Sequence, residues 1–283
     1  MLSSGQGSTH NAFYVEKDIT SWYQDGSLWD RIAGRNGYEL FEGIYPGCYF
    51  NMNNIIKTNT LTAGTASGTK KLLILGCDCR YGIGGSIGDD ATYINFHHII
   101  CCPETSFGND QMEINTEDNG LVSGYYNSYM NQQVLGPITN VADIGGTINQ
   151  QLYNEFGEHL KTCKDTFSHG LEPTILNRRG LTTNDGYGVS TSWHWEFYQS
   201  RLMSEIEICG SIIYSGSGND IASCNKQFPA FRLNIQDIEK RGNYYWSSTI
   251  GSYNGYVRFG GNGNTYIQTS TDKSGVRPCF VLS

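Results

Sequence analysis

The residues of this chain that come nearest to a metal site by type and spacing are histidines and cysteines in one short run. Residues 97–102 read HHIICC, and Cys77 and Cys79 could add two sulfur ligands from a neighbouring strand. Successive side chains of a strand point to opposite faces, so each adjacent pair in this run is split between the two faces. Zinc sites usually present paired ligands at loop spacing, which the run lacks. We therefore predict buried thiols and exposed or capped histidines, with no metal and no other cofactor.

The cysteines predict mostly reduced, buried thiols. Their number, nine, is odd, and the first twenty residues contain neither the basic segment nor the apolar segment of a signal peptide. Proteins of a reducing cytoplasm rarely keep disulfides, so we expect synthesis in a cytoplasm. The cysteines are Cys48, Cys77, Cys79, Cys101, Cys102, Cys163, Cys209, Cys224 and Cys279.

Two glycine-rich segments, residues 81–88 (YGIGGSIG) and 215–220 (SGSGND), invite comparison with phosphate-binding loops. A phosphate-binding loop joins a strand to a helix that begins with Lys and Ser or Thr, and neither segment has that context. Both segments are therefore predicted to be turns.

One histidine lies between two tryptophans in the segment TSWHWEFYQ, residues 191–199. Flat indole rings can form a stacking platform for a sugar, or they can be buried beside a polar histidine. Because tryptophan is highly buried on average, the sequence favours burial of Trp193 and Trp195 beside His194.

The charge of the chain excludes two classes of partner. The formal net charge is −8, charged residues make up 16% of the sequence, and Lys and Arg form no stripe. Binding to a phosphate backbone requires many cationic contacts, so nucleic acid is not expected as a partner. No apolar run approaches twenty residues, so no membrane insertion is expected.

Short aromatic, β-branched and apolar runs separated by Gly, Thr and Ser predict strands along much of the chain. The predicted strands before the C-terminal region are residues 48–52, 71–75, 93–100, 161–167 and 203–213. Residues 72–75 are apolar at every position, which is typical of a central strand that is buried on both faces.

Three helices are predicted. The clearest begins after Thr147, because Thr147 and Gln150 have the spacing of a capping box and apolar residues then recur at every fourth position. Shorter helices are predicted at residues 28–33 and 235–240. The side chains predicted to cap these short helices are Ser27 and Asn234.

The last forty residues are the most informative. Residues 244–283 read YYWSSTIGSYNGYVRFGGNGNTYIQTSTDKSGVRPCFVLS, which predicts a compact β-hairpin unit without a cluster of acids, bases or metal ligands. Tyr offers a large rigid contact area with a polar tip, and Asn offers adaptable hydrogen bonds, so we predict a recognition surface. The candidate ligand-binding residues are Tyr253, Asn254, Tyr256, Arg258, Asn262, Asn264, Tyr266 and Gln268.

Strand alternation within this unit separates inward from outward side chains. It places Tyr256 and Arg258 outward and Val257 and Phe259 inward. Pro278 has no amide hydrogen to donate, which predicts an edge position for the last strand. The alternative interpretation of the unit is a solvated β-surface that simply needs turn residues.

The C-terminal segments YYWSSTI, YVRF, TYIQT and SGVRPCFVL resemble the end of C-type-lectin-like domains of phage and prophage proteins. The same pattern occurs in target proteins of diversity-generating retroelements and, more distantly, in formylglycine-generating enzymes. Upstream, GGTINQQLYNEFGEHLKTCKDTF, MSEIEICG and FPAF are similar to a prophage family, so the resemblance covers roughly residues 120–283. It implies an α+β protein with a C-type-lectin-like fold, in which antiparallel sheets are flanked by helices. The calcium-binding triplets of true C-type lectins are absent, so calcium-dependent sugar binding is not implied.

The distant resemblance to formylglycine-generating enzymes raises the possibility of thiol chemistry. Those enzymes end in a similar strand with a Gly-Phe-Arg-Cys segment, whose cysteine works with a second cysteine close upstream. Here Pro278 separates Arg277 from Cys279, which shifts the thiol by one residue and moves it to the other face. Ser274 stands five positions before Cys279, where a partner thiol would be needed. We therefore expect no catalytic residues and no enzymatic activity.

The sequence shows no internal repeat and no convincing linker, so a single domain with an N-terminal arm is the simplest division, and the resemblance implies a role. Residues 1–46 would form an extended N-terminal arm that attaches to other virion proteins or mediates homo-oligomerisation, and a trimer would suit a fibre. Residues 47–283 would form the C-type-lectin-like domain, displayed on a bacteriophage virion as a decoration, head-fibre or tail-tip component that binds a host-surface glycan or protein. The protein would be made in the cytoplasm of the host bacterium. The alternatives are a purely architectural virion protein and an oxidoreductase related to the formylglycine enzymes.

Overall fold

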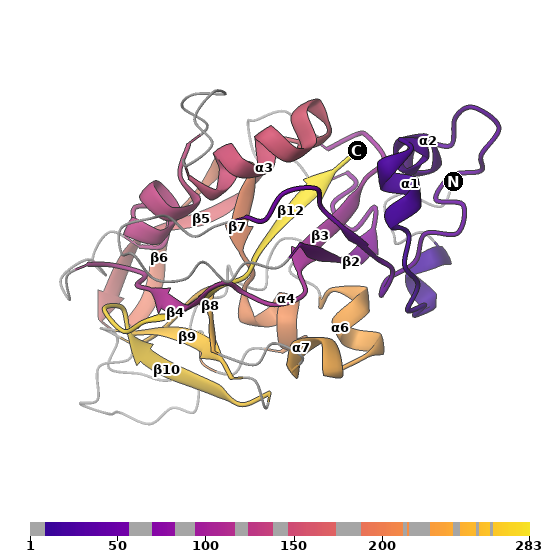
Figure 1. Ribbon diagram of the computed structural model, residues 1–283. Coiled ribbons are helices and arrows are strands. Elements are labelled where there is room, and N and C mark those ends of the chain that lie inside the picture. The colour runs from indigo at the N-terminus through magenta and orange to yellow at the C-terminus, as the bar shows by residue number, and fades with distance from the viewer. Residues whose placement is uncertain are drawn as a thin grey trace.

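The computed structural model describes residues 9–56, 70–82, 94–116, 124–137, 147–173, 188–211, 214, 227–239, 244–252, 255–260 and 263–283. Two five-stranded sheets and a two-stranded ribbon are surrounded by short helices (Figure 1). Strand pairs among the described residues are antiparallel except for one parallel contact, between β11 and β8. The α+β class predicted from the sequence is therefore confirmed.

The first sheet is the centre of the molecule. Its order is β1-β2-β3-β12-β7, with bounds Tyr49–Asn51, Lys71–Cys77, Ile99–Pro103, Pro278–Leu282 and Ser200–Leu202. All side chains of residues 72–75 are buried, which confirms the prediction of a central strand covered on both faces.

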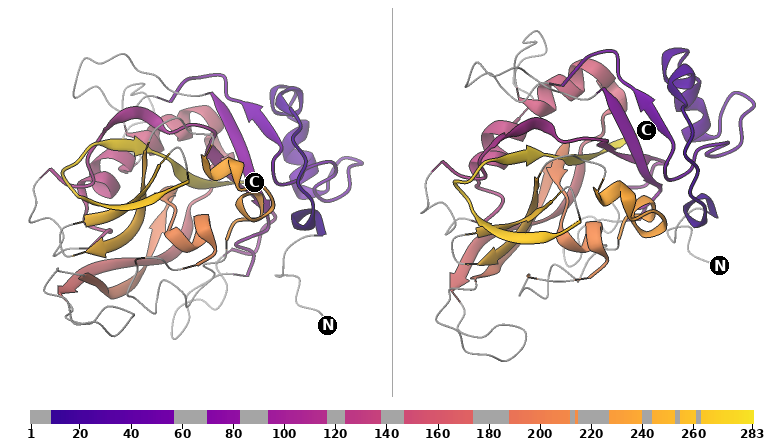
Figure 2. Two further views of the ribbon diagram at one scale, coloured as in Figure 1. Left: turned by 90° about the horizontal axis from the view of Figure 1, so that it is seen from below. Right: turned by 60° about the horizontal axis from the view of Figure 1, so that its bottom comes forward.

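Helices cover both faces of this sheet (Figures 1 and 2). On one face α3 (Ile148–Phe156) packs so that the ring centroids of Phe156 and Phe280 lie 6.0 Å apart. Its N-cap is as predicted, because Thr147 Oγ1 accepts a hydrogen bond from the Gln150 amide at 3.2 Å. On the other face α6 (Pro229–Leu233) packs on β2 at Gly76, where an added Cβ would lie 3.0 Å from the proline ring.

The second sheet contains the C-terminal hairpin unit. Its order is β10-β9-β8-β11-β4, with bounds Thr265–Thr269, Gly255–Phe259, Tyr245–Ser252, Ser274–Val276 and Phe107–Met112. The side chains of Tyr245, Val257 and Phe259 are fully buried, so one face of β8 and β9 closes over the core. The predicted inward orientation of Val257 and Phe259 is confirmed.

A long antiparallel ribbon extends from the core at the end of the molecule away from α1 and α2 (Figures 1 and 2). It pairs β5 (Cys163–Pro173) with β6 (Gly188–Tyr198), beginning with Cys163 opposite Tyr198. Shorter elements precede it, namely a π-helical turn at Met130–Leu135 and a 3-10 turn at Gly157–His159.

The N-terminal segment is folded onto the first sheet. It contains η1 (Thr9–Ala12), α1 (Thr20–Gln24) and α2 (Ser27–Ala33), and its side chains join the common hydrophobic core. The fully buried members of this segment are Ile19, Leu28, Ile32, Phe41 and Ile44. The described part of residues 1–46 is therefore packed on the sheet and is not an extended arm, while its role in attachment stays a prediction.

Sequence signals located both short helices, although one of the predicted caps is wrong. Gly34 ends α2 in the left-handed region at φ +63°, as predicted, but Ser27 is not the cap, because Gly26 occupies that position and the Ser27 amide donates to Asp25 at 2.8 Å. The predicted helix near residue 236 is present as α7 (Gln236–Glu239), where the Gln236 amide donates to Asn234 Oδ1 at 3.2 Å.

Three strand predictions are wrong. Residues 203–213 were expected to be a strand, but Ser204 and Glu207 form a reciprocal capping box, which starts α4 (Glu205–Cys209). The strand expected from residue 93 begins at Ile99, because the chain before it bends to bond Asp78. The last strand is internal, and Pro278 is tolerated because it is the first residue of β12.

No helix among the described residues is long enough and apolar enough to span a bilayer.

Candidate recognition site

The β9–β10 hairpin positions the candidate site. Its turn is closed by a hydrogen bond from the Gly260 amide to the Asn264 carbonyl at 2.7 Å, and Gly263 turns the chain at φ +77°, a conformation that favours glycine. The register places Arg258 directly opposite Tyr266. Side chains that are directly opposite in an antiparallel pair share a face, so these two residues project on the same side of the sheet.

Four polar and aromatic side chains meet on this face, which we call the Arg258 face: Tyr244, Arg258, Asn264 and Tyr266. The guanidinium carbon of Arg258 lies 4.3 Å from the centroid of the Tyr244 ring. The rings of Tyr244 and Tyr266 meet edge to face, with centroids 5.7 Å apart. Asn264 Nδ2 donates to the Tyr266 hydroxyl at 3.2 Å, and Arg258 Nη1 donates to Ser274 Oγ at 3.4 Å. These contacts fix the rotamers of the exposed side chains.

The Arg258 face has the chemistry of a recognition surface. Tyr266 keeps 37% of its surface exposed, Asn264 is exposed, and Arg258 is half-buried. A cation over an aromatic face, beside a phenol and an amide, can stack on a ligand and hydrogen-bond its polar edge. The face has no nucleophile held next to a base, so its geometry suits binding.

Gln268 is held by its own hairpin. Its Nε2 donates to Asp272, and Thr269 Oγ1 donates to the same carboxylate at 2.6 Å. The bonds from Thr269 and Gln268 lower the pKa of Asp272, because they stabilise the carboxylate form. Gln268 therefore closes the turn after β10, and its amide is less available to a ligand than the sequence suggested.

The structure corrects one predicted site residue. Tyr256 shares a face with Arg258, but β9 is an internal strand that is covered at this position, and Tyr256 is fully buried. Its hydroxyl has no hydrogen-bond partner within the described part of the chain, and burial raises its pKa. Tyr253, Asn254 and Asn262 lie outside the described residues.

Sequence reasoning missed Tyr244. It stands immediately before β8, and strand alternation says nothing about a residue just outside a strand. Its neighbour Tyr245 is buried, and extending the alternation of β8 by one residue would have placed Tyr244 on the opposite face.

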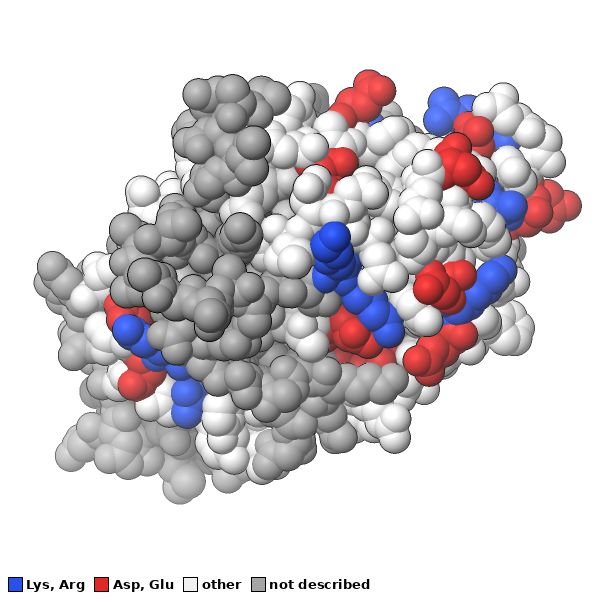
Figure 3. Space-filling view, viewed as in Figure 1, with Lys and Arg blue, Asp and Glu red and all other residues white. Residues whose placement is uncertain are grey.

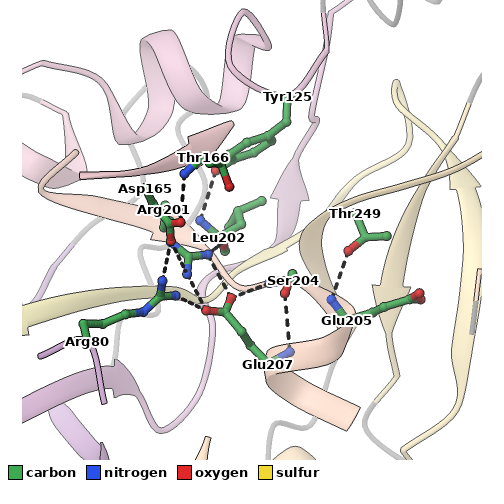
Figure 4. Close-up of polar contacts among 10 residues, drawn as sticks. All are labelled: Arg80, Tyr125, Asp165, Thr166, Arg201, Leu202, Ser204, Glu205, Glu207 and Thr249. Carbon is green, nitrogen blue, oxygen red and sulfur yellow. Dashed lines mark hydrogen bonds and ion pairs between the residues drawn. The ribbon is translucent and has the colours of Figure 1, made fainter. Parts of the chain in front are cut away.

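A second group of functional-looking side chains is a buried cluster of charges, which we call the buried tetrad: Arg80, Asp165, Arg201 and Glu207. Arg80 bonds Asp165 at 2.5 Å and also bonds Glu207 (Figure 4). Arg201 donates from Nη1 to Glu207 at 2.8 Å and lies 3.1 Å from Asp165. The four side chains come from the loop after β2, from β5, from β7 and from α4.

The buried tetrad stabilises the fold and offers little access to a substrate. The exposed fraction of each of its side chains is 6% or less. Two guanidiniums balance two carboxylates, and Glu207 also accepts from the Ser204 amide at 2.9 Å, so the charges are compensated. Burial raises the pKa of Asp165, while the Arg80 guanidinium offsets this in part.

Most residues of the HHIICC run are buried in the core, and His97 lies at its edge. The Arg80 amide donates to His98 Nε2 at 3.1 Å, so Nδ1 carries the proton and donates to the Phe96 carbonyl at 3.0 Å. Burial lowers the pKa of His98 to about 4. His97 Nδ1 lies 2.7 Å from Asp78, and both cysteines of the run are buried. In the described ranges, no group of three or more His, Cys, Asp or Glu residues could hold a metal ion.

The thiols are protected by burial. The eight described cysteines are free, and six of them are buried. Burial raises the pKa of Cys163 and of Cys79 to about 12, and it raises that of Cys279 well above its ordinary value. Cys224 lies outside the described residues. A thiol held in its protonated form is a poor nucleophile at neutral pH.

Comparison of the chain with protein-family models, with curated proteins and with solved structures found no match. The site is therefore defined by the contacts of its own residues.

Proposed function

We propose that this chain is a structural protein of a bacteriophage virion that displays a C-type-lectin-like domain and adheres to the host surface. Its place would be that of a decoration, head-fibre or tail-tip component. The observation that carries the adhesion proposal is the Arg258 face, where an arginine, two tyrosine rings and an asparagine are fixed by mutual contacts and reach solvent. The class of fold rests on the C-terminal sequence pattern together with the second sheet, which is antiparallel except for the contact between β11 and β8.

The ligand that suits this face is a polar molecule with little charge, such as a surface glycan or the side chains of a host protein. The Arg258 guanidinium lies on an aromatic ring and its Nη1 donates to Ser274, which leaves the N–H groups of Nη2 to hydrogen-bond at the ring edge. Acidic and basic side chains are interspersed on the face of the molecule drawn in Figure 3, and the net charge is −8. This distribution does not attract a polyanion.

Three features support a role without catalysis. The tetrad is charge-compensated and buried, the Cys279 thiol is held protonated by burial, and the Arg258 face lacks an activated nucleophile. General acid–base or thiol chemistry would require such groups to reach a substrate.

The N-terminal segment is proposed to attach the protein to other virion proteins or to further copies of the chain. It is packed on the first sheet on the side away from the ribbon, and it keeps Phe13 62% and Leu40 39% exposed. Exposed apolar side chains of this kind suit an interface. A trimer would present three Arg258 faces and strengthen weak adhesion through multivalency.

Adhesion is tested by binding of fluorescently labelled protein to a panel of intact bacterial strains. Wild type is compared with Tyr266→Ala, which removes the exposed ring of the Arg258 face. The matched control is Tyr38→Ala, because Tyr38 is also a surface tyrosine and its ring lies 4.1 Å from the Arg31 guanidinium. Thermal unfolding must show that both variants are folded.

We expect the wild type and Tyr38→Ala to bind one or more strains and Tyr266→Ala to lose most of that binding. If Tyr266→Ala binds as well as the wild type, the Arg258 face is not the adhesion site. A wild type that binds no strain, yet docks onto particles that lack it, would show that the protein is purely architectural.

A further inference from the structure

The β5–β6 ribbon has one buried face and one open face. On the buried face lie Cys163, Asp165, Phe167 and Tyr198, each less than a tenth exposed. The side chains between them in the sequence belong to the other face, and these are half-buried or exposed. Over residues 163–167 of β5, this alternation shows that one face packs on the core and the other is directed outward. Farther along β6, Glu196 and His194 share the core-facing side and are half-buried and exposed.

The open face carries a row of aromatic rings, which we call the aromatic row: Trp193, Trp195 and Phe197. The three residues alternate with His194 and Glu196, so all three project on one side of β6. Two residues along a strand advance about 7 Å, so the rings follow one another at close intervals. Phe197 is 57% exposed, and both tryptophans are half-buried.

The sequence prediction that Trp193 and Trp195 are buried beside His194 is correct only in part, because both tryptophans are half-buried and His194 does not share their face. The histidine lies on the opposite face of the ribbon, where its ring meets that of His169 edge to face at 4.7 Å. The two tryptophans keep part of their surface in solvent, as a stacking platform requires.

The neighbouring strand adds polar groups beside the rings. The register pairs Thr166 with Trp195 and Lys164 with Phe197. The Lys164 ammonium lies 5.4 Å from the centroid of the Phe197 ring, and Gln199 Nε2 donates to the exposed Thr162 hydroxyl at 3.2 Å. Two hydroxyls, an amide and an ammonium therefore lie near Trp195 and Phe197, while Trp193 is opposite the buried Ser168.

We propose that the aromatic row and the polar groups beside it form a binding site for the chain of a neutral oligosaccharide. The C–H groups of a pyranose ring form an apolar face that stacks on an aromatic ring, and its hydroxyls then reach the ring edges, where this ribbon places Thr162, Lys164, Thr166 and Gln199. The site is separate from the Arg258 face and shares no residue with it.

Charge and polarity favour a saccharide over other macromolecules. Bases of a single-stranded nucleic acid also stack on aromatic rings, but their phosphates need several cations, and among the residues that the structure describes one lysine is paired directly with the row. The core of a protein–protein interface is depleted of charged residues, whereas here the Lys164 ammonium lies beside the Phe197 ring at the end of the row.

The site is preorganised by the buried face beneath it. Asp165 is fixed by Arg80 and Arg201, and the Phe167 ring stacks on Tyr125 with centroids 5.9 Å apart. A rigid backbone under exposed rings lowers the entropic cost of binding. This arrangement lets a two-stranded ribbon present a stable row of rings.

The test is a titration of the full-length protein with chitohexaose, cellohexaose and maltohexaose and on an array of bacterial surface polysaccharides. Binding is followed by tryptophan fluorescence and by calorimetry. We expect one saccharide class to bind with a shift in tryptophan emission, and Trp195→Ala to weaken its affinity at least tenfold. Trp195→Tyr keeps a flat ring and should retain most of the affinity, which separates stacking from a folding defect.

Tyr266→Ala serves as the control for independence, because it alters only the Arg258 face. It should bind the saccharide as the wild type does, even if cell adhesion is lost. The proposal is overturned if no saccharide binds, if Trp195→Ala binds as the wild type does, or if an oligo-dT probe binds the row more tightly than any saccharide.

Discussion

Two groups of side chains in this molecule, the buried tetrad and the Arg258 face, use the guanidinium group in opposite ways. In the buried tetrad, Arg80 and Arg201 are enclosed and face carboxylates, so their charges are neutralised inside the core. On the Arg258 face, the guanidinium lies half-buried over the ring of Tyr244 at 4.3 Å. The first arrangement leaves little for a ligand to contact, while the second keeps polar groups at the surface. Burial and choice of partner, more than residue type, separate structural arginines from recognition arginines.

The largest effect is expected from breaking the buried tetrad. Glu207→Gln leaves Arg80 and Arg201 without one of their two carboxylates and weakens the cap of α4. Removing one partner from a buried ion pair costs about 3–5 kcal/mol of unfolding free energy. Urea unfolding of both proteins measures the difference.

The control for this variant is Glu104→Gln, which breaks the ion pair between Lys71 and Glu104 at the surface. Exposed pairs contribute about 0–1 kcal/mol, so the two losses should differ severalfold. Equal losses would mean that the tetrad does not hold the elements together.

The next effect is a pH dependence of stability caused by His98. Burial lowers its pKa to about 4 in the folded protein, while the unfolded chain should titrate at about 6.5. The folded state thus favours neutral His98, so its contribution is complete above about pH 6.5 and is lost as the pH falls toward 4. The difference corresponds to about 3 kcal/mol.

Urea unfolding at a series of pH values tests this dependence, with His98→Gln as the comparison. The variant should lose less stability between pH 6.5 and 4 than the wild type does, whatever its stability at neutral pH. Parallel curves for the two proteins would contradict the prediction.

A smaller effect separates the covered Tyr256 on β9 from the exposed Tyr266 on β10. The Tyr256 hydroxyl is buried and finds no partner among the described residues, so Tyr256→Phe should stabilise the protein by about 1 kcal/mol. Tyr266→Phe, at the surface, should change stability by less than about 0.5 kcal/mol. Thermal and urea unfolding measure both, and a clear loss on Tyr256→Phe would show that the hydroxyl is satisfied.

Local sequence signals predicted the elements whose stability is local. Thr147 and Gln150 located the start of α3, and the apolar run 72–75 located a central strand. The signals failed where hydrogen bonds between residues close in sequence favoured a helix, although the pattern of apolar residues predicted a strand. The alternating segment after Met203 suggested a strand, yet the Ser204–Glu207 capping box makes it a helix.

The candidate site was predicted less well, because exposure depends on the neighbouring elements. Strand alternation correctly predicted that Tyr256 and Arg258 share a face. It could not show that β9 is an internal strand and that Tyr256 is covered. The same limit hid the open face of the ribbon, where Trp195 was expected to be buried. The buried tetrad joins residues from Arg80 to Glu207, a long-range arrangement that no spacing rule reveals.

The measurement that tests the central claim most directly is hydrogen–deuterium exchange of the full-length protein with and without cell envelopes from a strain that it binds. We expect slower exchange in peptides that cover β9 and β10, residues 255–269, and unchanged exchange in α1 and α2. Protection confined to the N-terminal helices, with β9 and β10 unaffected, would contradict it.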